Sequence, residues 1–199
     1  MLGGVVVGLE LVYLIPLNMY YHDNILLNKK TIEQHPDAAQ SYYALASFYR
    51  CQGQLQQAID YLKMYIIKRS QWVHYEDIRP ICGIYRELGE LYREDPDQAI
   101  FYFKKSIQAN PRFADAYADM GKAYLLKKDY AKAKEYLQTA HSLNPQLVTE
   151  HIYSMELLNA LSQPEEARAL LEKAKEIFPE DRFLLQYEKS TYPQPQAGP

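Results

Sequence analysis

The chain has few of the residues that would build a covalent framework or a strongly charged surface. Its 199 residues include only two cysteines, Cys51 and Cys82, and neither has a second cysteine at CxxC spacing. A disulfide framework and a thiol-based metal site are therefore not expected. Lysine and arginine total 22 against 25 aspartates and glutamates, a net charge of −3, which gives no basic footprint for phosphates. We expect no nucleic-acid partner.

Patterns that support catalysis are also missing. The glycine-rich start at residues 3–8 is not followed by Lys-Ser or Lys-Thr, so it is not a phosphate-binding loop, and no GxSxG element is present. The five histidines, none of which forms an i, i+4 pair, are His22, His35, His74, His141 and His151. The sequence therefore predicts a protein that is not an enzyme, with no metal ion and no cofactor.

A repeat of 34 residues dominates what remains. Ala99 is followed by alanines at two successive steps of 34, and Pro111 is followed by prolines in the same way; the later members are Ala133, Ala167, Pro145 and Pro179. A register of this length indicates stacked units, none of which buries its apolar face alone. Such a chain is expected to present an extended binding surface. The 19 tyrosines are expected mainly at helix–helix contacts.

The clearest unit runs from residue 114 to residue 147 and predicts an antiparallel helical hairpin. Apolar or small residues recur at helical spacing on one face of each helix: Tyr117, Met120, Gly121 and Tyr124, then Tyr130, Ala133, Leu137 and Ala140. Residues 127–129 form the turn, and Asn144-Pro145 ends the second helix. Gly121, Ala133 and, one repeat earlier, Gly89 are expected to be wedged between helices.

This pattern resembles the tetratricopeptide repeat, and it recurs in several units. The resemblance implies an all-α fold, a right-handed α-solenoid of stacked antiparallel hairpins with about four full repeats, a partial N-terminal hairpin and a C-terminal capping helix. The unit from residue 148 departs from the pattern, since His151 replaces an aromatic residue and Met155 replaces the glycine.

The chain is expected to divide into three parts. The first is an apolar helix at 1–20, and the last is a disordered proline-rich tail at 191–199. Between them lies a repeat domain at 21–190, with units near 39–72, 82–113, 114–147 and 148–181, an insertion at 73–81 and a capping helix at 182–189.

Two interpretations of the N-terminal apolar segment stay open. Residues 2–17 are almost continuously apolar, and as a helix they span about 24 Å, so a membrane crossing requires continuation to Tyr21. The segment is either a membrane anchor through residues 2–21, which predicts a membrane-associated protein, or a packed helix of an incomplete hairpin in a cytoplasmic one. The first forty residues also resemble the end of membrane glycosyltransferases that carry such repeats. That resemblance implies the alternative function of an accessory or C-terminal segment of a glycosyltransferase system.

The expected function is a non-catalytic scaffold that binds a protein or peptide segment in the concave groove lined by the first helix of each repeat. The candidate groove residues are Tyr43, Ser47, Arg50, Arg86, Glu87, Glu90, Arg93, Asp115, Asp119, Lys122, Tyr153 and Glu156. Ion pairs are expected at helical spacing between Arg86 and Glu90 and between Asp119 and Lys122. The Lys/Asn/Arg clamp by which some tetratricopeptide proteins hold a carboxylate tail is not present. A second candidate interface surrounds Trp72.

Overall fold

The computed structural model describes residues 24–70 and 81–192, and every regular element within those ranges is helical. Residues 24–34 are helical. The labelled helices are α2 (Ala39–Cys51), α3 (Leu55–Ser70), α4 (Ile81–Leu91), α5 (Pro96–Ala109), α6 (Ala114–Leu126), α7 (Tyr130–Leu143), α8 (Val148–Ala160), α9 (Pro164–Ile177) and α10 (Arg182–Thr191). The all-α class is confirmed.

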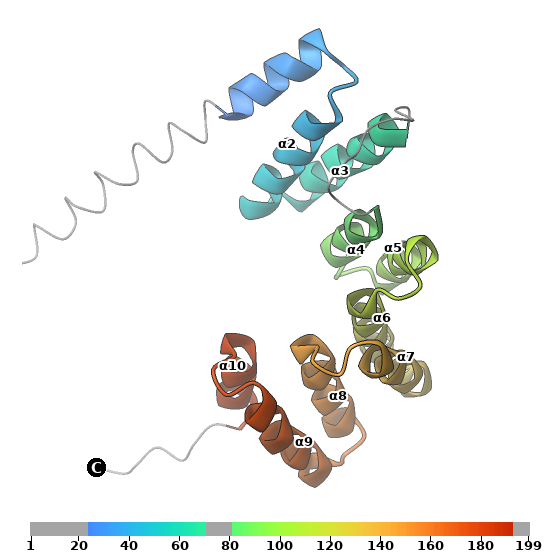
Figure 1. The fold of residues 1–199 in the computed structure, drawn as a ribbon, viewed down its shortest axis with the longest axis vertical. Helices are drawn as coiled ribbons and strands as arrows, with labels where there is room; N and C mark the ends of the chain where they lie inside the picture. The colour runs from blue at the N-terminus through green and yellow to red at the C-terminus, as the bar shows by residue number, and fades with distance from the viewer. Residues whose placement is uncertain (1–23, 71–80, 193–199) are drawn as a thin grey trace, which may run out of the picture. The chain divides into compact units, whose positions relative to one another are not determined.

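The helices pair as antiparallel hairpins in two compact units. In the first unit, which ends at residue 78, α2 packs on α3. In the second unit, α4 packs on α5, α6 on α7 and α8 on α9, and each hairpin contacts the next (Figure 1). Adjacent hairpins stacked in this way are the predicted architecture.

Three of the four hairpins have the same backbone conformation in the turn between their two helices. Gly53, Lys128 and Ser162 follow the first helix with φ of 71°, 59° and 59°, the left-handed region. Their neighbours on the C-terminal side donate backbone hydrogen bonds to the carbonyl five residues earlier, as Asp129 does to Tyr124 at 3.0 Å. This is the Schellman arrangement, which satisfies carbonyls that the helix end leaves open. In the α4–α5 turn, the side chain of Asp95 caps Pro96–Ala109 by accepting from the backbone amide of Gln98.

The small residues lie where helices approach one another, as predicted. A Cβ added to Gly89 would lie 2.3 Å from Cε1 of Phe103, and one added to Gly121 would lie 2.7 Å from Cγ of Leu137. Ala133 is fully buried. Because a side chain at either glycine would collide with the second helix of its own hairpin, the close pairing depends on these residues.

Stacked tyrosine pairs join the two helices of three hairpins. The rings of Tyr49 and Tyr61 stack at 5.3 Å between centroids, and the equivalent pairs are Tyr92 with Tyr102 at 5.5 Å and Tyr124 with Tyr136 at 5.3 Å. Their planes lie within 9° of parallel. In the α8–α9 hairpin leucines stand at the corresponding positions. The abundance of tyrosine is thus explained in large part by helix packing.

The last helix closes the apolar core of the second unit. Leu184 of α10 is fully buried against a cluster that includes Met155 and Leu171. Asp181 caps the helix by accepting from the backbone amides of residues 183 and 184. Tyr192, just after α10, lies within hydrogen-bonding distance of the Asn159 side chain.

The structure corrects two predicted boundaries and leaves two predictions untested. The expected tail at 191–199 begins too early, because Thr191 belongs to α10, and the expected insertion at 73–81 ends too late, because Ile81 begins α4. The apolar helix at 1–20 and the region around Trp72 lie outside the described residues. Among residues 24–70 and 81–192, no helix has the length and hydropathy needed to cross a membrane.

Candidate groove and a histidine cluster

The first helices of the second unit border a surface hollow of about 510 Å³. Residues of α4, α6 and α8 line it together with the start of α5 and the ring of Phe103. Five of the predicted groove residues are among them: Glu90, Arg93, Asp119, Lys122 and Tyr153. The hollow lies where first helices of neighbouring repeats meet.

Arg86 holds two carboxylates beside this hollow. Its Nε donates to Asp119 Oδ2 at 2.6 Å, from α4 to α6, and its Nη2 lies 2.7 Å from Oε1 of Glu90 on the same helix. Burial lowers the pKa of Arg86, but the charges of Asp119 and Glu90 raise it by more, so the guanidinium stays charged. The Arg86–Glu90 pair is the one predicted from helical spacing.

Asp119, one of the predicted groove residues that line the hollow, is a buried acid. Its side chain is 7% exposed, and its predicted partner Lys122 is replaced by Arg86 of the preceding repeat. Burial raises the pKa of Asp119 to about 6, against the opposing effect of Arg86 and with a contribution from the charge of Glu90. The carboxyl group of Asp119 therefore changes its charge at mildly acidic pH.

Lys122 pairs instead with Glu156, one repeat later on α8. Its Nζ also lies 5.2 Å from the centroid of the Tyr153 ring, within the range of a cation–π contact. Burial, followed by the charges of Asp119 and Glu156, raises the pKa of Tyr153, so its hydroxyl stays protonated. These contacts link α6 to α8 as Arg86 links α4 to α6.

Of the remaining predicted groove residues, Asp115 contributes to this network through its charge, which raises the pKa of both Arg86 and Asp119. Arg93 is largely exposed and lies 3.4 Å from its neighbour Glu94. Glu87 and Asp115 are half-buried on α4 and α6. Tyr43, Ser47 and Arg50 lie on α2 in the first unit, where the Tyr43 ring packs edge-on against Tyr65 and Ser47 lines a separate hollow beside helical residues 24–28.

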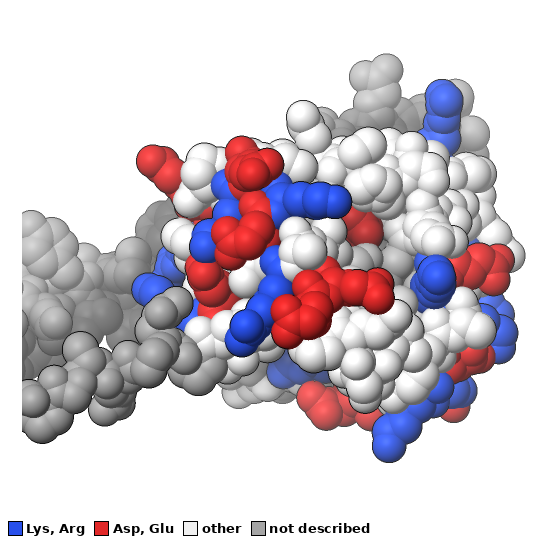
Figure 2. Space-filling model, turned by 90° about the horizontal axis from the view of Figure 1, so that it is seen from below, with Lys and Arg blue, Asp and Glu red and all other residues white. Residues whose placement is uncertain are grey.

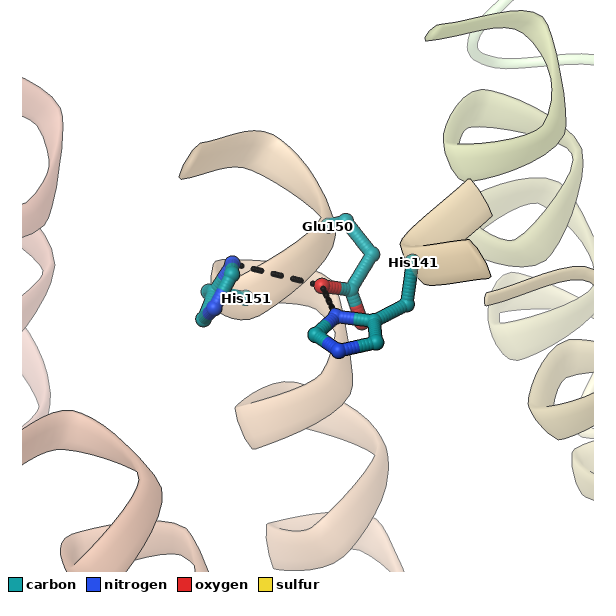
Figure 3. Close-up of side chains that lie close together, drawn as sticks. All are labelled: His141, Glu150 and His151. Atoms are coloured by element: carbon teal, nitrogen blue, oxygen red, sulfur yellow. Dashed lines mark hydrogen bonds and ion pairs between the residues drawn. The ribbon is translucent and has the colours of Figure 1, made fainter. Parts of the chain in front are cut away.

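A cluster of side chains that the sequence reasoning missed lies between α7 and α8. His141 in the last turn of α7 and Glu150 and His151 in the first turn of α8 point toward one another (Figure 3). Nδ1 of each imidazole lies close to the same carboxylate oxygen, Glu150 Oε2, at 3.1 Å for His141 and 3.2 Å for His151. No expectation from the sequence brings His141 and His151 together, although both contact one carboxylate. The cluster spans a turn between two helices, so a search for i, i+4 pairs could not find it.

Charges of both signs lie side by side on one face of the protein. On the face seen in Figure 2, acidic and basic side chains interleave, and neither forms a continuous patch of one sign. Such a face offers no broad electrostatic attraction for a polyanion.

Comparisons with known proteins agree with this architecture. Residues 27–60 and 90–151 match the tetratricopeptide repeat family. Among solved structures, a thermophilic tetratricopeptide protein of Thermus thermophilus is 23% identical, with a TM-score of 0.64 over 90% of this chain and 94% of the other. YrrB, described as having an unusual peptide-binding site, is 17% identical, with a TM-score of 0.63 over 89% of this chain and 88% of the other.

MamA from Desulfovibrio magneticus RS-1 is 16% identical, with a TM-score of 0.66 over 81% of this chain and 88% of the other. At these identities the likenesses establish the fold alone. No curated protein matches the sequence. The comparisons give no support to the resemblance to membrane glycosyltransferases.

Proposed function

We propose that this chain, which carries tetratricopeptide repeats, is a non-catalytic scaffold that binds a segment of a partner protein in the hollow bordered by α4, α6 and α8. The observation that carries the proposal is the convergence of first-helix side chains from three consecutive repeats on one hollow. The repeat architecture supports it, because stacked hairpins form extended concave surfaces that other chains can occupy.

The pairing of charges around the hollow determines which partner chemistry fits. Arg86 is engaged by Glu90 and Asp119, and Lys122 is engaged by Glu156. A partner carboxylate would have to compete with these internal ion pairs. The apolar lining includes Leu126, Ala123 and the ring of Tyr153. The hollow therefore favours an extended or helical segment with apolar anchors and little net charge.

A matched pair of exposed aliphatic residues tests the site. Leu126, the last residue of α6, lines the hollow and is 52% exposed, whereas Ile177, the last residue of α9, is 50% exposed and is absent from its lining. Peptides selected from a displayed random library on the full chain should lose at least about tenfold in affinity with Leu126→Asp, because a buried anchor is worth more than about 1.4 kcal/mol. Ile177→Asp should leave their affinity unchanged.

Two results would contradict the proposal. Selected peptides that bind both variants as well as the parent protein would place the site elsewhere. Peptide affinity that falls equally in the two variants, with both shown to be folded by far-UV circular dichroism, would also contradict binding in the hollow.

Membrane association through residues 2–21 stays a separate prediction, since those residues lie outside the described ranges. Partitioning of the full chain between membrane and soluble fractions, compared with a chain that begins at Tyr21, measures it. If the apolar segment anchors the protein, only the full chain should sediment with membranes after carbonate extraction. Equal partitioning of the two chains would favour the packed-helix interpretation.

A further inference from the structure

We propose that His141, Glu150 and His151 form a binding site for a divalent transition-metal ion, with Zn²⁺ as the best match. One ligand atom from each of the three side chains lies within 4.8 Å of the other two. Two imidazole nitrogens and one carboxylate oxygen form a donor set that zinc uses with three protein ligands and one open position. The site is separate from the hollow of α4, α6 and α8, whose lining contains none of these residues.

The spacing between the carboxylate oxygen and each imidazole nitrogen fits tetrahedral coordination. Zinc–nitrogen and zinc–oxygen bonds of about 2.0–2.1 Å at tetrahedral angles place neighbouring ligand atoms about 3.3–3.4 Å apart. Nδ1 of His141 and Nδ1 of His151 lie 3.1 and 3.2 Å from Oε2 of Glu150. An ion seated among the three atoms would therefore require shifts of only a few tenths of an ångström in these two edges.

The carboxylate is already oriented by a neighbouring hydroxyl. Ser154, one turn later on α8, donates to the second oxygen, Glu150 Oε1, at 2.7 Å. This leaves Oε2 for the two imidazoles (Figure 3). Hydrogen bonds that orient a ligating carboxylate are typical of metal sites, and removing one typically weakens metal binding about 10- to 100-fold.

One side of the cluster is buried, and the other side is open to solvent. Glu150 and His151 have side chains only 6% and 4% exposed, while that of His141 is 55% exposed. His141, Glu150 and Ser154 also line a surface hollow of about 320 Å³. An ion can therefore enter from the His141 side, and its open coordination position would face this hollow.

Metal binding must remove the Nδ1 proton from both imidazoles, either to Nε2 of the same ring or to solvent. Nδ1 of His151 lies 3.1 Å from the carbonyl oxygen of Leu147 as well as near Glu150. In the metal-free chain a proton on Nδ1 satisfies these acceptors, and the ion takes its place, since a ligating imidazole nitrogen must be deprotonated. The bound ion would connect the end of one repeat to the start of the next.

The direct test is titration of the full, untagged chain with Zn²⁺ by calorimetry, together with the visible spectrum of Co²⁺ bound at the same site. We expect one ion per chain and the intense d–d bands of a tetrahedral cobalt complex. His141→Ala, at an exposed side chain, should weaken binding by more than about 100-fold, because loss of a ligand exceeds the effect of losing an orienting hydrogen bond. Ser154→Ala should weaken it by about tenfold.

Matched controls separate this site from chance metal binding. His35→Ala removes an exposed histidine in the first unit, and Cys51→Ser removes the exposed thiol; both should leave the affinity unchanged. Glu150→Gln keeps the shape of the side chain and should lose Zn²⁺ binding.

Absence of saturable binding, an octahedral cobalt spectrum, or unchanged affinity in His141→Ala would each overturn the proposal. Any of these results would leave a carboxylate hydrogen-bonded by two imidazoles as the whole role of the cluster.

Discussion

Gly89 allows the sharpest test of how the hairpins are held together. An alanine at this position places its Cβ 2.3 Å from Cε1 of Phe103 and 2.6 and 2.8 Å from two further ring atoms. The ring cannot move away freely, because Phe103 is 4% exposed and belongs to the same apolar cluster as Met120. Gly89→Ala must therefore separate α4 from α5 or force Phe103 out of its packed position.

Two opposing effects set the size of the change. Overpacking a close-packed core by one methyl group costs about 1–3 kcal/mol, while replacing a helical glycine by alanine contributes about 1 kcal/mol in the other direction. Because three ring atoms of Phe103 lie within 3.0 Å of the added Cβ, the overpacking cost is expected in the upper part of this range, at about 2–3 kcal/mol, which leaves a net loss of about 1–2 kcal/mol of unfolding free energy. A Cβ added to Gly83, on the same helix, would meet no neighbouring side chain within 4 Å among the described residues, so Gly83→Ala should instead stabilise by about 0.5–1 kcal/mol.

Urea unfolding of the full chain, followed by far-UV circular dichroism, measures both variants. The midpoints should move in opposite directions from the parent protein. A double variant, Gly89→Ala with Phe103→Leu, should be less destabilised than the sum of the two single changes, since a smaller side chain at 103 accommodates the new methyl group. An alanine at 89 that leaves the midpoint unchanged or raises it would refute the claim that close helix approach requires glycine there.

Two further substitutions test the buried polar groups. With a pKa of about 6 against 3.8 for an ordinary carboxyl, folded Asp119 binds a proton before the unfolded chain does, so its contribution to stability is present at low pH and declines as pH rises through about 6. The unfolding free energy of Asp119→Asn relative to that of the parent protein, measured by denaturation at pH 4 and at pH 7, should therefore be about 2–3 kcal/mol higher at pH 7 than at pH 4. A relative unfolding free energy that is the same at both pH values would contradict the raised pKa of Asp119. Ser106→Ala removes a buried 2.7 Å hydrogen bond to the Cys82 carbonyl and should cost about 1 kcal/mol, whereas the exposed Ser142→Ala should cost almost nothing, and equal midpoints would contradict this ranking.

The parts of the fold that the sequence predicts are those set by local spacing. Gly121 and Ala133 are predictable between helices because small residues at a fixed register mark where two backbones approach, and both are buried there. The start of α4 is not predictable in this way, because the segment before it interrupts the repeat and no periodic pattern fixes the boundary. Ile81 is its first residue.

The candidate site is less predictable, because its ion pairs form between repeats as well as along one helix. Spacing on a helix suggests that Asp119 pairs with Lys122, yet each has its partner on a neighbouring helix. The repeat register contains this signal, since Lys122 and Glu156 are 34 residues apart and occupy the same position in successive units. The histidine cluster has no comparable signal, because it depends on how the last turn of α7 meets the first turn of α8.

The same register bears on the partner that we propose for the groove, because it pairs the charges of the groove with one another. Gly89, Gly121 and Met155 occupy equivalent positions in three consecutive units, and the residues that follow them are Glu90, Lys122 and Glu156, so the sign of the charge alternates from one repeat to the next. Stacking brings Lys122 to Glu156, and Arg86 spans from Glu90 to Asp119, so charges are neutralised by adjacent repeats. A partner would have to break these pairs to gain an ionic contact. The side chain that binds without such a cost is that of Leu126, which is 52% exposed, and we therefore expect Leu126, and not the charged residues, to determine affinity.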